Sequence, residues 1–165
     1  MNTFGNKFRI SIFGESHGQM IGVVVDGVPA GIPLSEEDFT EDLSRRKSGA
    51  FGTTPRVESD IVHIQSGIFN GHTTGAPVCF TVANKSRVST DYIQFENHPR
   101  PGHADFTCSS KYKGYSDIRG GGHHSGRVTI GLVAAGVIAK KIIEPISVYA
   151  SVIEIGGAKQ WESLI

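Results

Sequence analysis

The sequence lacks the marks of several common protein classes. Among its 165 residues there are only two cysteines, Cys79 and Cys108, and no CxxC pair. One disulfide is possible, but two reduced thiols are the expected state. The 16 basic and 16 acidic residues leave no net charge, which argues against a general nucleic-acid-binding protein.

Long hydrophobic runs are also missing. The N-terminal residues contain no apolar stretch of the signal-peptide kind, and the most apolar segment, Val128 to Ile143, is shorter than the roughly 20 residues that span a bilayer. We therefore expect a cytoplasmic protein with no membrane partner. Hydrophobic residues make up 38% of the chain, which is enough for the core of one domain or of part of a larger one.

Several catalytic motifs do not occur. The sequence contains no HExxH, GxxxxGK[ST] or GxSxG pattern, and its glycine-rich segment is not a strand-borne GxGxxG. Metalloprotease, P-loop, α/β-hydrolase and Rossmann assignments are therefore weak. His123 and His124 are adjacent, so a regular helix or strand would direct them apart, and we predict no metal site.

The most informative stretch runs from His98 to Arg127 and holds four of the seven histidines, together with arginines and glycines. It has almost no apolar periodicity, so we expect a loop. Arginine binds phosphate or carboxylate with paired hydrogen bonds, glycine lets the backbone approach a ligand, and histidine exchanges a proton near neutral pH. These residues predict an anion-binding, proton-transferring site. The candidate anion-binding residues are Arg45, Arg46, Arg56, Arg100 and Arg127, and the candidate acids are His17 and His103.

Apolar periodicity predicts strands around this stretch. Alternation from Phe8 to Ile12 and the apolar run from Ile21 to Val25 flank the glycine-bounded GESHG segment, which predicts a hairpin with His17 at its tip. Further strands are predicted at 61–65, 78–82 and 146–155.

Two helices are predicted. Ser35 precedes three acidic residues and so marks a helix start, and Phe39 and Leu43 share one face of that helix. The segment from Val128 to Ile143 is apolar nearly all round, which is typical of a buried helix. Ser125 is its expected N-cap, and the free N–H groups at that end would face a bound anion.

The motifs in their order resemble the chorismate synthase family. The matching blocks are GESHG at 14–18, EDLSRRKSG at 41–49, SGIFNGHTTGAP at 66–77, HPRPGHAD at 98–105 and DIRGGG at 117–122. The resemblance implies an α+β fold, part of a sandwich in which a helical layer lies between two antiparallel sheets. It also implies that residues 1–165 correspond to the N-terminal portion of one longer domain, whose full-length form is a homotetramer.

The resemblance further implies a lyase. Family members convert 5-enolpyruvylshikimate 3-phosphate to chorismate by 1,4-elimination of phosphate, and they need reduced FMN, which lends an electron and recovers it. The site residues follow by motif. His17 resembles the acid that serves the departing phosphate, and His103 the one that protonates the flavin. The implied substrate-binding residues are Arg45, Arg46, Arg56, Arg100 and Arg127, and the implied flavin contacts are Ser125, Gly126 and Arg127.

The chain departs from the family pattern at four of the seven positions from 123 to 129, including His124 and Gly126, and keeps Ser125, Arg127 and Thr129. Where the family commonly reads R-S-S-A-R-E-T, this sequence has histidine at position 123 and Val128 in place of the glutamate. The family's C-terminal half, which carries a catalytic aspartate, has no counterpart among these 165 residues. Two alternatives to the lyase therefore stay open: a non-catalytic fragment that binds a phosphorylated metabolite or flavin, and a metal-dependent phosphatase suggested by the histidines.

Overall fold

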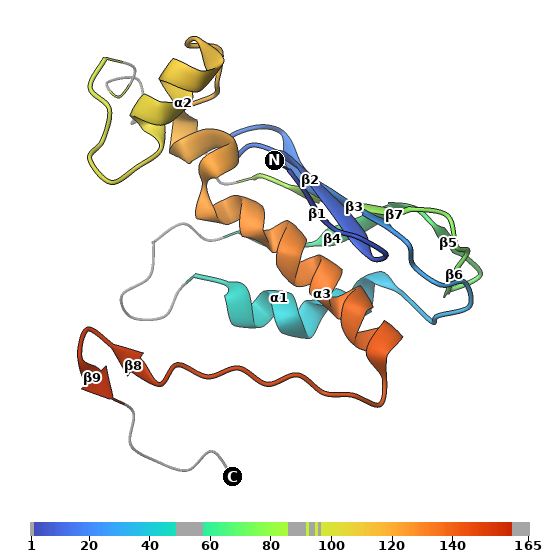
Figure 1. The fold of residues 1–165 in the computed structure, drawn as a ribbon. Helices are drawn as coiled ribbons and strands as arrows, with labels where there is room; N and C mark the ends of the chain where they lie inside the picture. The colour runs from blue at the N-terminus through green and yellow to red at the C-terminus, as the bar shows by residue number, and fades with distance from the viewer. Residues whose placement is uncertain (1, 49–57, 86–91, 93–94, 96, 160–165) are drawn as a thin grey trace.

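An antiparallel sheet of five strands forms one layer of the molecule (Figure 1). The computed structural model describes residues 2–48, 58–85, 92, 95 and 97–159. The strand order is β1-β2-β3-β7-β4. The strands are β1 Thr3–Gly5, β2 Arg9–Gly14, β3 Met20–Asp26, β4 Val62–Ser66 and β7 Val78–Ala83. Two small ladders join β5 Ile68–Phe69 to β6 His72–Thr73 and β8 Glu154–Ile155 to β9 Ala158–Lys159.

The predicted hairpin is confirmed as β2 and β3, in which Ile10 pairs with Val25 and Ile12 pairs with Val23. The central strand β3 also pairs with β7, where Val23 lies opposite Phe80. Alternate residues of both strands are buried, because one face of the sheet is covered and the other is not. The strands predicted at 61–65 and 78–82 are confirmed as β4 and β7, each shifted by no more than one residue at either end.

The helices form the second layer. Their bounds are η1 Glu36–Phe39, α1 Thr40–Arg46, α2 Asp105–Tyr112, η3 Arg119–His124, η4 Gly126–Thr129 and α3 Ile130–Ile143, where η marks a 3-10 helix. The predicted start at Ser35 is confirmed, since its backbone N–H donates to the Asp38 carboxylate at 2.8 Å. Phe39 and Leu43 are buried on the shared face as predicted.

Helix α3 crosses the covered face of the sheet, and α1 packs beside it (Figure 1). A Cβ at Gly131 would lie 3.3 Å from Ile12 side-chain atoms and 3.5 Å from Val23, so this glycine allows the close approach of helix and sheet. The Lys140 ammonium bonds to the Asp42 carboxylate of α1 at 2.6 Å. The α+β class is therefore confirmed, with antiparallel strands under a helical layer.

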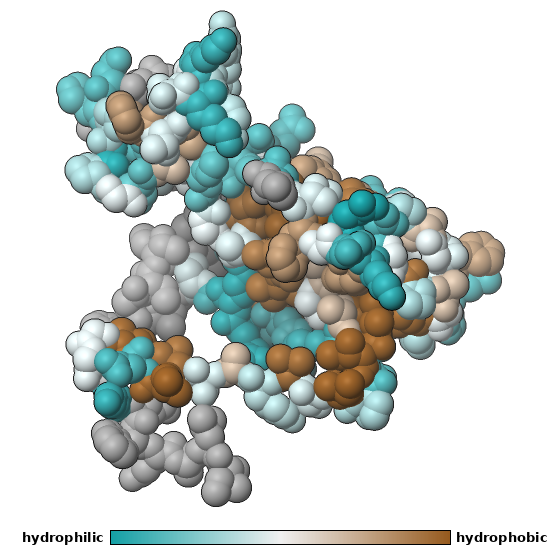
Figure 2. All heavy atoms as spheres, in the orientation of Figure 1, coloured by the Kyte–Doolittle hydropathy of each residue, from teal (hydrophilic) through white to brown (hydrophobic). Residues whose placement is uncertain are grey.

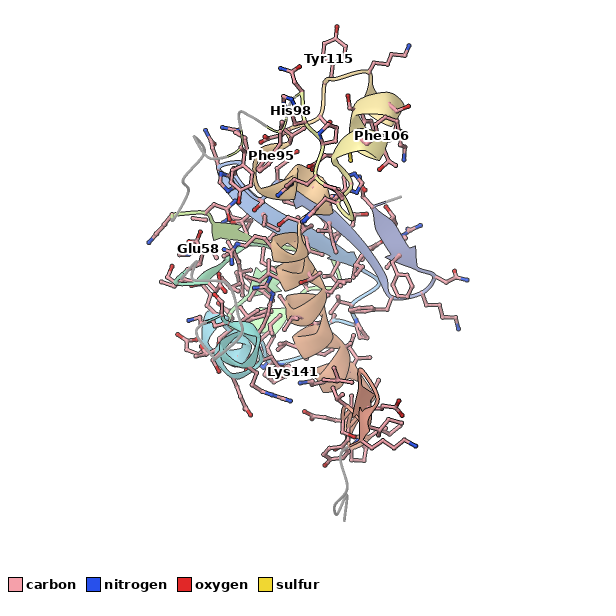
Figure 3. All side chains as sticks on the ribbon, turned by 90° about the vertical axis from the view of Figure 1, so that its left-hand side faces the viewer. Glu58, Phe95, His98, Phe106, Tyr115 and Lys141 are labelled. Atoms are coloured by element: carbon pink, nitrogen blue, oxygen red, sulfur yellow. The ribbon has the colours of Figure 1, made fainter. Side chains whose placement is uncertain are left out.

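Three predictions were wrong in part: the loop at 98–127, the strand at 146–155 and the fully buried helix at 128–143. The stretch from His98 to Arg127 is not a loop throughout, because α2 forms within it. The sequence of α2, DFTCSSKY, shows no helical apolar period, and the helix buries little beyond Asp105 and Cys108. It projects from the rest of the fold (Figure 1), and Phe106 and Tyr115 at that end are 68% and 92% exposed (Figure 3).

The predicted strand at 146–155 is also wrong, since only Glu154 and Ile155 of that range pair with a strand that the structure describes. Its alternating apolar side chains are exposed, because no described part of the chain lies against them. Helix α3 is not buried all round either, as Leu132 is 46% exposed. Figure 2 shows apolar atoms over the C-terminal part of α3 and again near β8.

Candidate active site

Three consecutive glycines, 120–122, press the loop before α3 against the turn that carries His17. All three have positive φ angles, a conformation that side chains other than glycine rarely adopt. A Cβ at Gly120 would lie 2.5 Å from His17 Cδ2 and 2.8 Å from Ser16 Oγ. The GGG segment therefore brings the two loops closer than any residue with a side chain would allow.

His17 lies between β2 and β3, as predicted, but it is buried rather than solvated. Only 4% of the residue is exposed. Its ring meets the Tyr92 ring edge-on, with 5.0 Å between centroids. The backbone N–H of Ser16 donates to the Gly122 carbonyl at 3.0 Å, which fixes the turn against the glycine loop. Because Ser16, Tyr92 and Gly120 all line one cavity, His17 stands immediately behind the wall of that cavity.

Two arginines from different helices share one buried carboxylate. Arg46 ends α1, Arg127 lies in η4, and the Asp60 side chain between them is only 2% exposed. Arg127 Nη1 donates to Asp60 Oδ1, and Arg46 Nη1 is 3.7 Å from Asp60 Oδ2. Two guanidinium groups therefore face a single acidic group, which leaves a local excess of positive charge.

The remaining donors of this pair are not all satisfied. Arg46 Nη2 donates to the carbonyls of Gly126 and Arg127 at 3.1 and 3.2 Å, and Arg127 Nε donates to Asn84 Oδ1 at 3.2 Å. Arg46 Nε and Arg127 Nη2 are buried and bond to nothing that the structure describes. Since buried donors are almost always paired, a bound phosphate or carboxylate would complete the group.

Burial is the main electrostatic influence on Arg46. Loss of solvent lowers the pKa of its guanidinium, the Asp60 carboxylate raises it, and the neighbouring Arg127 lowers it again. Arginine nevertheless remains charged at neutral pH, because its ordinary pKa is far above that range. The pair therefore offers a permanent positive charge to a ligand.

A cavity of about 430 Å³ opens in front of the two arginines, a size typical of small-molecule sites. Glu58 reaches it from the segment before β4 and accepts a hydrogen bond from the Lys85 backbone at 3.0 Å. Three basic and two acidic side chains are among the lining residues, so positive charge prevails. The lining consists of Ser16, Arg46, Lys47, Ser48, Glu58, Asp60, Tyr92, Gly120, Ser125, Gly126 and Arg127.

A smaller cavity of about 170 Å³ shares Gly120, Ser125 and Gly126 with the first. His103, an exposed residue, lines it. The glycine loop therefore contacts His17 through Gly120 and also lines the cavity that His103 lines.

Arg100 also lines the smaller cavity, but its guanidinium is bound within the protein. Nε and Nη2 donate to the two oxygens of Asp105 at 2.8 and 2.9 Å, and the Arg100 backbone N–H adds a third bond at 3.1 Å. The guanidinium lies over the rings of Tyr92 and Phe95, 5.5 and 4.8 Å from their centroids. Figure 3 shows Phe95 and His98 at the same end of the molecule as α2. The arginine holds the pKa of the Asp105 carboxyl below its ordinary value.

Of the remaining predicted site residues, one lies at the cavity, one lies away from it, and one is not described. The Arg45 side chain is 74% exposed and lies 4.0 Å from the Asp42 carboxylate. It is not among the residues that line the cavity of Arg46. Arg56 lies outside the described residues. Ser125 is confirmed as an N-cap, of the η4 turn that leads into α3, and its Oγ accepts from the Arg127 backbone N–H at 3.3 Å.

Sequence reasoning missed three buried polar residues. Asp60, Glu58 and Asn84 are 6%, 7% and 4% exposed, and each contacts the site from the β4 or β7 side. None belongs to a motif with chemical meaning. The one available signal was Asn84, which lies two residues after the alternating strand predicted at 78–82, at a point where side chains tend to enter functional loops.

No group of three or more metal-binding side chains occurs within the described ranges, and no helix described there is long and apolar enough to cross a membrane. Both cysteines are free thiols, Cys79 half-buried and Cys108 buried, and burial raises the pKa of each.

The α+β fold and its cation-lined cavity beside a buried histidine define a site suited to a small anionic ligand. Residues 8–164 match the family profile of chorismate synthase. The chain therefore belongs to the chorismate synthase family.

The relatives agree with this family. The chain is 60% identical over 158 residues to a chorismate synthase of Chitinophaga pinensis, covering 95% of this chain and 48% of that protein. It is 57% identical over 144 residues to one of Methanocaldococcus jannaschii, covering 87% and 38%. A crystal structure of a chorismate synthase superposes with a TM-score of 0.56 at 28% identity, over 82% of this chain and 34% of that one. The chain thus spans about half, or less, of the length of these relatives.

Proposed function

We propose that this chain is the N-terminal part of a lyase that converts 5-enolpyruvylshikimate 3-phosphate to chorismate and phosphate. The observation that carries the proposal is the buried Arg46–Asp60–Arg127 group beside His17. The substrate bears one phosphate and two carboxylates, and two guanidiniums with a single internal counterion leave donors for such a ligand.

In this proposal His17 gives a proton to the departing phosphate. The 1,4-elimination breaks a C–O bond to phosphate and a C–H bond at C6, and negative charge grows on the phosphate oxygen. His17 stands behind Ser16 and Tyr92 in the cavity wall, shielded from bulk water. A buried imidazole there can supply a proton to a group held by the arginines, and water does not compete for it.

The residues around the glycine loop fit reduced FMN, which the reaction needs. Gly126 has open space where a side chain would stand, and Ser125 lines both cavities. Ser125, Gly126 and Arg127 would hold the cofactor, and His103 would hold a proton near its ring. When bound, the flavin supplies transient electron transfer to the substrate with no net redox change.

The anion-binding assignment rests mainly on Arg46 and Arg127. Arg56 keeps this role as a prediction. Arg45 points to solvent and Arg100 is bound to Asp105, so we assign neither a direct contact with substrate. Assembly as a homotetramer and a cytoplasmic location are further parts of the proposal, and both rest on the family resemblance.

A second reading is a non-catalytic fragment that binds a phosphorylated metabolite or flavin. Two observations favour it: the chain spans less than half of its relatives, and the apolar side chains of Ile146, Val148 and Ile153 are exposed. Those side chains would be covered if further chain packed against them.

The test is anaerobic chorismate formation with reduced FMN. It is run on the 165-residue chain and on a chimera that continues into the C-terminal half of the Chitinophaga pinensis relative. Chorismate from either form supports the lyase. Binding of substrate or FMN without product in both forms would favour the fragment reading.

His17→Ala, made in the active form, sharpens the test. Loss of a general acid is expected to lower kcat roughly 100-fold. The matched control is His72→Ala, which removes an exposed histidine of the β5–β6 ladder and is expected to leave kcat unchanged. Equal kcat values for the two variants would rule out the proton role of His17.

A further inference from the structure

Asn84 lies where the anion-binding arginines meet the turn that carries His17. It directly follows β7 and is buried, and its side chain makes three hydrogen bonds. Nδ2 donates to the carbonyl oxygens of Glu15 and Gly18, both at 3.0 Å. Oδ1 accepts from Arg127 Nε at 3.2 Å. One amide group therefore contacts both halves of the proposed site.

Only an amide in this orientation satisfies all three partners. Two carbonyl oxygens need donors and a guanidinium N–H needs an acceptor, which a carboxylate, a hydroxyl or an apolar side chain cannot provide together. The backbone N–H of Asn84 also donates to the Gln19 carbonyl at 3.0 Å, which fixes the residue beside the turn. Both polar atoms of the buried amide, Nδ2 and Oδ1, are thus hydrogen-bonded, as expected of an amide that stabilises the structure.

The two carbonyls that Asn84 binds belong to residues on either side of His17. The turn is also held by the bond from the Ser16 backbone to Gly122 and by the contact with Gly120. The glycine loop and Asn84 therefore both clamp the turn. Asn84 is the clamp that also contacts Arg127.

We propose that Asn84 is a positioning residue that couples Arg127 to the His17 turn. An anion bound to the Arg127 guanidinium would contact a group that is hydrogen-bonded to Asn84. The same Asn84 amide holds the turn that positions the His17 imidazole. This inference rests on the proposed function and deepens it, since it makes anion binding and proton donation depend on one side chain.

The discriminating variant is Asn84→Asp, which keeps the shape and an acceptor for Arg127 but cannot donate to the two carbonyls. We expect kcat in the active form to fall roughly 10- to 100-fold, because the acid is misplaced. KM is expected to rise as well, because the new carboxylate offsets part of the positive charge of Arg127, so the fall in kcat is the readout that decides.

Asn84→Ala removes both contacts, so kcat is expected to fall similarly and KM to rise about tenfold. The control is Thr81→Val in β7, the strand that Asn84 follows. It removes the bond from Gln65 to the Thr81 hydroxyl at 3.3 Å. Wild-type kcat in Asn84→Asp, or a change confined to KM, would overturn the proposal.

A second measurement does not depend on activity. Amide hydrogen exchange at Ser16 in the 165-residue chain is expected to be about tenfold faster in Asn84→Asp, because the clamped turn opens more often. Thr81→Val is expected to match the wild type. If neither form of the protein makes chorismate, the proposed function fails, but this readout still decides the positioning role.

Exchange at Ser16 that is unchanged in Asn84→Asp would overturn the proposal. Should that variant not fold, Asn84→Ser takes its place, since a single hydroxyl can serve one of the two carbonyls. Faster exchange in Asn84→Ser than in Thr81→Val supports the proposal, and equal rates contradict it.

Discussion

Two arginine–carboxylate groups lie in the candidate site, and their hydrogen bonding differs. Arg100 has a carboxylate to itself and donates to both oxygens of Asp105. Arg46 and Arg127 share Asp60, and each retains a buried donor without a described partner. An arginine whose guanidinium is bound to its own carboxylate stabilises the scaffold. A pair with too few acceptors keeps free donors, which is the basis of the proposed anion binding.

The two groups also differ in what they hold together. Arg100 and Asp105 are five residues apart and shape one turn and the start of α2. Asp60 and Arg127 are 67 residues apart and join the segment before β4 to the start of α3. The second group therefore exists only after the chain has folded. The proposed binding of an anion by this group therefore depends on tertiary structure.

The largest expected effect comes from Arg127→Lys. Lysine keeps the positive charge but cannot bond to Asn84, Asp60 and a ligand at once in a planar arrangement. We expect kcat/KM for chorismate formation to fall about 100-fold or more. Arg100→Lys is the comparison, and a larger loss there than at position 127 would reverse the assignment of the two groups.

The next effect is on stability. Asp60→Asn removes the shared carboxylate and leaves two buried guanidiniums without a counterion, which is expected to cost about 3 kcal/mol of unfolding free energy. Asp60 has a φ of 52°, and asparagine tolerates that conformation, so the substitution tests charge rather than backbone.

Urea denaturation measures this change, and added inorganic phosphate is expected to stabilise Asp60→Asn more than the wild type. Asp42→Asn is the control, because its carboxylate pairs with the half-exposed Lys140 and is expected to contribute less than about 1 kcal/mol. Equal losses at the two positions would contradict the account of a buried, shared charge.

A smaller effect is expected at Asp105. Its pKa is lowered by Arg100 in the folded state, so the carboxylate stabilises the fold above its ordinary pKa of 3.8. That stability is lost as pH falls through the lowered value. In Asp105→Asn the unfolding free energy is expected to depend less on pH below about pH 4, with a loss of about 1 kcal/mol at neutral pH. An unchanged acid dependence would show that the pair contributes no stability.

Much of the scaffold could be predicted from the sequence, because apolar periodicity reports burial locally. The β2–β3 hairpin, α1 and α3 each have a clear pattern, and each was found. Helix α2 was not predicted because its eight residues bury little and show no such pattern. The segment 146–155 failed for the opposite reason, since it has the pattern of a strand but only its last two residues, Glu154 and Ile155, pair with a described strand.

The site was predictable only in its motif residues. His17 and Arg127 were identified because their neighbours match a family pattern. The sequence could not show that Arg46 rather than Arg45 enters the cavity, because that choice depends on how α1 packs. Asp60 and Asn84 carry no motif, and their roles come from contacts across 67 and 43 residues of chain.

The central claim is that the buried arginine pair binds the substrate anion, and the two neighbouring arginines of α1 test it most directly. KM for 5-enolpyruvylshikimate 3-phosphate is measured anaerobically for Arg46→Ala and Arg45→Ala in the active form. We predict that KM rises about tenfold or more in Arg46→Ala and stays at the wild-type value in Arg45→Ala. An equal rise in both variants, or a rise only in Arg45→Ala, would contradict the account.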